Sequence, residues 1–130
     1  MNVELIRRFC LSFPHATENL QWGDVLCFKV GGKLFAMLNM NTVPPHLVLK
    51  STPEKFGELV ELEGIVPAAY VGRYNWVSVE RGDALPWIEL QDLVRESYAL
   101  VVAKVRKADL GKKKSPRKIK KKKRVKPRRK

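Results

Sequence analysis

The sequence predicts an α+β fold, an antiparallel sheet with helices packed on one face, and three observations lead to it. A glycine pair at 31–32 separates two apolar segments, as in a tight hairpin. Apolar residues recur at helical spacing near both ends of the folded part, over residues 3–13 and 87–105. No strand–helix–strand unit repeats along the chain, so a parallel α/β sheet is not predicted.

The first half of this fold begins with a helix over residues 3–13. Asn2 is expected to cap its N-terminus, and Pro14 is expected to end it. The hairpin strands follow at residues 25–30 and 33–40, because the two glycines between them can adopt the positive φ angles that a tight turn requires.

Proline and threonine positions organise the middle of the chain. Adjacent prolines cannot pair within a sheet, so residues 41–45 are predicted as a loop and residues 46–50 as a third strand. Thr52 followed by Pro53 and an acid is typical of a helix start. The predicted helix covers residues 54–62.

The last third of the folded part contains the longest predicted element. Residues 64–74 mix glycine and proline with aromatics and are predicted as an ordered loop, and residues 75–80 as a strand. Gly82 is expected to turn the chain. The helix predicted over residues 87–105 is amphipathic and is expected to cover the sheet.

Charge is distributed very unevenly along the 130 residues, whose formal net charge is +13. Residues 111–130 contain 14 of the 26 Lys and Arg residues and no acid, which leaves 12 basic residues against all 13 acids in residues 1–110. We therefore predict a nearly neutral folded domain at 1–110 and a polybasic tail at 111–130. The tail has too little apolar surface to fold and is predicted to be disordered.

Several classes of protein are not supported by the sequence. No apolar stretch is long enough to cross a membrane, and early charged residues argue against a secretory signal, so we expect a cytoplasmic protein that could associate with the nucleoid and does not insert into membranes. Cys10 and Cys27 fit that compartment as buried, reduced thiols. No cysteine or histidine spacing indicates a metal, and we expect no cofactor and a monomeric state.

Four segments resemble the YjbR/MmcQ-like family: QWGDVLCFKVGGKLFAMLN (21–39), LKSTPEKFGELVE (49–61), IVPAAYVGRYNWVSVE (65–80) and ESYALVVAKV (96–105). The resemblance spans roughly residues 12–107. It implies a two-layer fold related to the frataxin/CyaY arrangement, and a DNA-binding function. In the loop before Trp76, where many relatives carry a histidine and additional lysines, this chain keeps Arg73 as its basic residue.

The tail is the first candidate for a nucleic-acid contact. A flexible cationic segment binds by neutralising phosphates and releasing counterions, which requires charge density but no particular residue order. DNA is the expected partner, and such a tail distinguishes RNA from DNA poorly. A solubilising extension and a localisation or anionic-lipid signal are the alternatives. The predicted contacts are Lys112, Lys113, Lys114, Arg117, Lys118, Lys120, Lys121, Lys122, Lys123, Arg124, Lys126, Arg128, Arg129 and Lys130.

The folded domain supplies a second set of candidates. Lys29 and Lys33 flank the glycine turn and could brace a phosphate, and Arg73 lies in the loop before Trp76. The simpler interpretation of the two lysines is a solvated hairpin end. The aromatic residues of these regions could stack on unpaired bases or pack in the core. The alternative function is a protein-interaction or small-ligand module with a pocket lined by Trp22, Tyr70 and Trp76, the tail serving solubility or localisation.

Enzymatic and metal-dependent functions have little support. His15 and His46 are the only histidines, and neither has a nucleophile or paired carboxylate at a diagnostic spacing. The Gly-Gly-Lys sequence at 31–33 lacks the remainder of a phosphate-binding loop. The predicted first helix has too few acidic residues to bind a hard cation. From these three observations together, we expect a protein that is not an enzyme.

Overall fold

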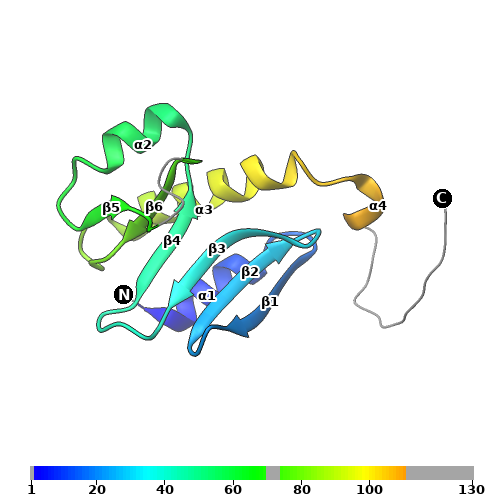
Figure 1. Ribbon diagram of the computed structural model, residues 1–130, viewed down its shortest axis with the longest axis horizontal. Coiled ribbons are helices and arrows are strands. Elements are labelled where there is room, and N and C mark those ends of the chain that lie inside the picture. The colour runs from blue at the N-terminus through cyan, green and yellow to red at the C-terminus, as the bar shows by residue number, and fades with distance from the viewer. Residues whose placement is uncertain (1, 70–73, 111–130) are drawn as a thin grey trace.

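The computed structural model describes residues 2–69 and 74–110, and it confirms the α+β class. One six-stranded antiparallel sheet, in the order β1-β2-β3-β4-β6-β5, carries helices on one face (Figure 1). The elements are α1 (Val3–Leu11), β1 (Ala16–Gln21), β2 (Val25–Val30), β3 (Lys33–Asn39), β4 (His46–Lys50), α2 (Pro53–Leu59), β5 (Ile65–Pro67), β6 (Trp76–Val79), α3 (Trp87–Val102) and α4 (Lys107–Leu110).

The predicted helix caps are present at both N-termini. The Asn2 side chain accepts a hydrogen bond from the Leu5 N–H at 2.9 Å, and the Thr52 hydroxyl accepts one from the Lys55 N–H at 3.1 Å. The first helix ends at Leu11 rather than at residue 13, because the Ser12 hydroxyl and the Ser12 N–H both donate hydrogen bonds to the Phe9 carbonyl and cap the last turn. The second helix is likewise shorter than predicted.

Two strands were not predicted, and both lie at an edge of the sheet. β1 has few β-forming residues, and it forms because it pairs along its whole length with the apolar strand β2, from Ala16 opposite Val30 to Gln21 opposite Val25. β5 lies within the segment predicted as a loop, and its three residues pair with β6. Pro67 is tolerated there because an edge strand has one unpaired side.

The core lies between the sheet and the helices. Phe28, Phe35 and Leu38 from the sheet are fully buried, and Ile6 of α1 and Val94 of α3 pack against the same cluster. The predicted long helix stops at Val102 and is followed by the short helix α4. The helices therefore cover one face of the sheet, and no helix of residues 2–69 and 74–110 lies on the other, here called the helix-free face (Figure 1).

The predicted glycine hairpin is present, and its turn packs against the segment that follows α3. Gly31 and Gly32 have φ angles of +57° and +81°. A Cβ atom on Gly31 would clash with Cγ1 of Val105, whereas a Cβ atom on Gly32 would meet nothing within 4 Å. The first glycine is thus required both for its conformation and for this close approach.

Replacing Gly31 by alanine is expected to lower the free energy of unfolding by about 2–3 kcal/mol, because the methyl group clashes with Val105 and the φ angle is strained. Gly32→Ala is the matched control, since it carries strain without a clash and is expected to cost about 1 kcal/mol. Chemical denaturation of both variants measures the difference. Equal losses would contradict the contact with Val105.

Candidate functional site

The two lysines predicted to flank the hairpin turn are found there. Lys33 is exposed and Lys29 is half-buried on the helix-free face, where it pairs with Leu34 of β3. Arg73 and the tail residues 112–130 lie outside the described residues. Among the described residues, the candidate site therefore consists of the hairpin and its neighbours.

Three further lysines that sequence reasoning missed lie at the same end of the sheet. Lys104 and Lys107 flank the Val105 segment, which packs on the Gly31 turn. Lys50 ends β4 on the helix-free face, opposite Trp76. Because only β3 separates β4 from β2, the backbones that carry Lys50 and Lys29 are about 10 Å apart.

Ion pairing separates the described arginines from most of the described lysines. Every described arginine lies within 4 Å of a carboxylate, and Arg7 is the best example, with Glu18 at 2.7 Å. The hydrogen bond from Arg7 to Glu18 raises the pKa of the guanidinium. Lys55 is also paired, with Glu58. The lysines without an ion pair to another described residue are those of the hairpin end, here called the lysine cluster: Lys29, Lys33, Lys50, Lys104 and Lys107.

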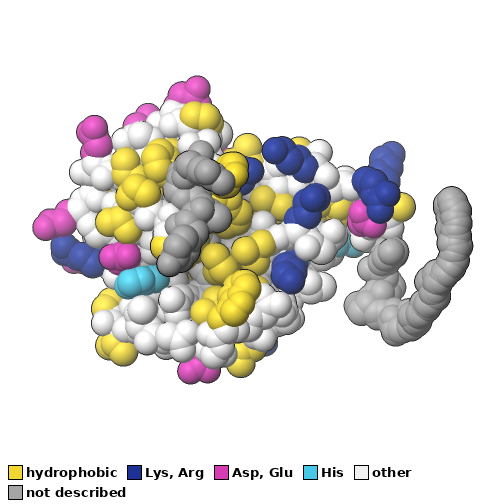
Figure 2. All heavy atoms as spheres, viewed as in Figure 1, with side chains coloured by type: hydrophobic (Ala, Val, Ile, Leu, Met, Phe, Trp, Pro, Cys, Tyr) yellow, Lys and Arg dark blue, Asp and Glu magenta, His cyan; other side chains and the backbone are white. Residues whose placement is uncertain are grey.

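Acidic side chains gather at the other side of the molecule. A groove of about 360 Å³ between α2 and α3 is lined by Glu89, Asp92 and Glu96, together with Lys55. In Figure 2 most of the Asp and Glu side chains lie over the α2 side, whereas most of the Lys and Arg side chains lie over the side of α4. The nearly neutral domain therefore has a charge dipole with its positive end at the lysine cluster.

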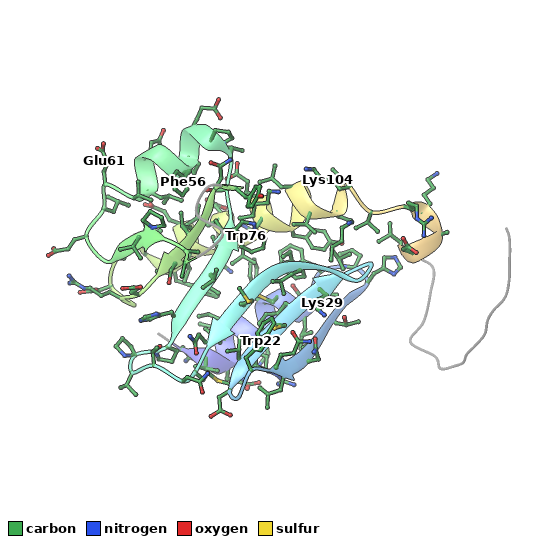
Figure 3. All side chains as sticks on the ribbon, in the orientation of Figure 1. Trp22, Lys29, Phe56, Glu61, Trp76 and Lys104 are labelled. Atoms are coloured by element: carbon green, nitrogen blue, oxygen red, sulfur yellow. The ribbon has the colours of Figure 1, made fainter. Side chains whose placement is uncertain are left out.

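The predicted pocket of Trp22, Tyr70 and Trp76 is wrong. Trp22 follows β1 and is 68% exposed, whereas Trp76 begins β6, and three strands separate the two strands in the sheet. Their positions also lie at opposite ends of the strands (Figure 3). The sequence could not show this separation, because it depends on the strand order. Tyr70 lies outside the described residues.

A hollow of about 340 Å³ opens on the helix-free face, and we call it the open-face hollow. Met37 and Val48 lie on the strands that form its floor. Its polar groups come from Asn39, His46, Ser78 and Glu80. The His46 Nδ1 atom lies 3.7 Å from a carboxylate oxygen of Glu80, which is too long for a hydrogen bond. The remainder of the lining comes from Pro67, Ala68 and Ala69.

The remaining reactive groups are buried or dispersed. Both thiols are buried and free, as predicted, and burial raises the pKa of Cys10 to about 12. Among residues 2–69 and 74–110, no three His, Cys, Asp or Glu side chains are grouped so that they could hold a metal ion. No helix in this part of the chain has the length and apolar character that a membrane crossing needs.

Comparisons with known proteins agree with this architecture. A protein of Escherichia coli O157:H7, described as uncharacterized protein YbdF, is 30% identical over 110 residues, which cover 82% of this chain and 88% of that one. The crystal structure of the Deinococcus radiodurans protein DR2400, with a DUF419 domain, is 32% identical and superimposes with a TM-score of 0.75 over 88% of this chain and 91% of that one. A Pseudomonas syringae protein, structural genomics target PsR293, has a TM-score of 0.65 at 22% identity, over 78% of this chain and 99% of that one, and supports the fold alone. The model of the YjbR family matches residues 11–100, and the chain therefore belongs to the YjbR family.

Proposed function

We propose that the protein is a non-enzymatic, monomeric, cytoplasmic DNA-binding protein whose lysine cluster and polybasic tail contact the phosphate backbone. The observation that carries the proposal is the lysine cluster itself. Its members come from β2, β3, β4 and the segment after α3, and none is neutralised by another described residue. Desolvated or paired cations contribute little to phosphate binding, whereas free lysines at one end of a domain raise the local affinity for a polyanion.

The position at which the tail leaves the domain supports the same proposal. α4 ends at Leu110 (Figure 1) and is followed in sequence by the tail with its 14 basic residues. The segment before α4 lies against the hairpin turn, because Val105 closely approaches Gly31. Tail and lysine cluster can therefore act on the same stretch of duplex. Such binding reads charge and shape and has little sequence preference.

We also infer that the fold is of the frataxin-like type that the resemblance implies. Support comes from the antiparallel sheet, which has an N-terminal helix, α1, and a long C-terminal helix, α3, packed on the same face. This inference concerns the fold alone and does not extend to iron binding. The charged residues of α1 are Glu4, Arg7 and Arg8, and both arginines form ion pairs with the single carboxylate of the helix.

The triple variant Lys29→Gln/Lys33→Gln/Lys104→Gln tests the contribution of the domain. If each lysine meets one phosphate, the slope of log affinity against log salt becomes shallower by about 3, and affinity at about 0.1 M salt falls by 10-fold or more. Fluorescence anisotropy with a labelled duplex measures both quantities.

The matched control removes the same charge from the other sides of the domain. Arg8→Gln/Lys55→Gln/Arg81→Gln replaces three cations that are each paired with a carboxylate. It is expected to change affinity by less than about 3-fold. The same loss of affinity in both triple variants would show that only net charge matters and would contradict a defined lysine cluster.

A further inference from the structure

We propose that the open-face hollow binds one unpaired guanine base of a DNA strand whose phosphates contact the lysine cluster. The inference rests on the proposed function, since it assigns the base-binding part of the same surface. Ser78 is 6% exposed, and its hydroxyl makes no hydrogen bond to another described residue. A buried hydroxyl is normally hydrogen-bonded, so an unpartnered one that lines a hollow indicates a ligand atom.

The sheet register directs Ser78 into the hollow. Ser78 pairs with Val48 of β4 on one side and with Val66 of β5 on the other. Its neighbours Val77 and Val79 are buried in the core cluster, so the Ser78 side chain is on the opposite, helix-free face. The same alternation puts Val48 on this face between the buried residues Leu47 and Leu49.

The size and polarity of the hollow suit a planar heterocycle. Its volume, about 340 Å³, is in the range of small-ligand sites. Met37 and Val48 offer an apolar surface against which a ring can pack. The polar side chains of the lining can form hydrogen bonds with the edge of that ring. A phosphate is disfavoured inside, because the carboxylate of Glu80 contributes a negative charge there.

The Glu80 carboxylate, which has the His46 Nδ1 atom 3.7 Å away, selects the kind of base. No hydrogen bond is made by the Glu80 carboxylate to another described residue, and its side chain is 40% exposed, so both oxygens can accept. Guanine presents two adjacent donors on its Watson–Crick edge, an N–H and an amino group, which match a carboxylate in a bidentate pair. Thymine presents a single N–H on that edge. In a duplex this edge is already paired, so only an unpaired base can enter.

The phosphates of the same strand have a path to the lysine cluster. Lys50 lies two residues beyond Val48 on β4 and on the same face, about 7 Å along the strand. Trp76 lies two residues before Ser78 on β6, opposite Lys50, and is half-buried on this face. A neighbouring base can stack on the indole while its phosphate meets Lys50.

The test compares two labelled oligonucleotides on the full-length chain. One is an oligothymidylate of about 15 nucleotides, and the other carries a single guanine at its centre. At about 0.1 M salt, the guanine is expected to raise affinity about 10-fold, as charge-assisted hydrogen bonds to one base do. Glu80→Gln is expected to abolish this preference and to leave binding of the oligothymidylate within about 2-fold of the Glu61→Gln control.

Glu61→Gln is the matched control, because it removes one carboxylate from the α2 side of the molecule (Figure 3), and Glu61 does not line the hollow. It is expected to retain the full guanine preference. Equal affinity of the unmodified chain for the two oligonucleotides, or a preference that survives Glu80→Gln, would overturn this inference and leave the proposed function standing. Absence of binding to either oligonucleotide and to duplex DNA would overturn both.

Discussion

Replacing Ser97 by alanine is expected to lower the free energy of unfolding by about 2–4 kcal/mol, because one fully buried hydroxyl joins two strands to α3. The hydroxyl donates to the Phe35 carbonyl at 2.6 Å and accepts from the Lys50 N–H at 2.9 Å. The alanine variant leaves both backbone groups without this partner. Urea denaturation monitored by circular dichroism measures the loss.

Ser78→Ala is the matched control for that experiment. Both serines are buried, but Ser78 has no hydrogen bond to another described residue, so its hydroxyl can be removed at little cost. The change in free energy is expected to stay within about 0.5 kcal/mol. Equal destabilisation by the two substitutions would show that the hydrogen bonds of Ser97 do not stabilise the contact between α3 and the sheet.

Deleting residues 111–130 is expected to lower the affinity for a DNA duplex at least about 100-fold at 0.1 M salt. The deletion removes 14 positive charges, and each phosphate contact contributes almost one unit to the salt dependence of binding. The remaining affinity is expected to come from the lysine cluster. Titration of a labelled duplex with the full-length and shortened chains measures the change.

Two controls accompany the deletion. Thermal unfolding should be nearly unchanged, because the core residues all lie within the first 101 positions. A chain in which the tail basic residues are replaced by glutamine should behave like the deletion, since charge and not length is responsible. If the shortened chain binds duplex as tightly as the full-length chain does, the role assigned to the tail is incorrect.

The parts of the fold that local sequence patterns determine were predictable. The glycine pair predicted the hairpin, and Asn2 and Thr52 predicted the two helix starts, because each of these features depends on residues only a few positions apart. β1 was missed because its six residues have little strand preference of their own and are organised by β2. The three-residue strand β5 carries no periodic signal at all.

The candidate site was predictable only in part, for a related reason. Lys29 and Lys33 were found because they flank a recognisable turn. Lys104 joins them through the contact of Val105 with Gly31, which links residues more than 70 positions apart. The open-face hollow depends on β4 and β6 being neighbours, and nothing in a single sequence indicates that order. Long-range pairing therefore decides which of the singled-out residues share a surface.

We propose that this protein binds DNA through the lysine cluster and the polybasic tail. The most direct test is the salt dependence of binding of the full-length chain to one labelled duplex. With about half of the tail charges and part of the lysine cluster in contact with phosphates, the slope of log affinity against log salt is expected to be about −6 or steeper. A slope close to zero, or no binding even at low salt, would contradict the claim.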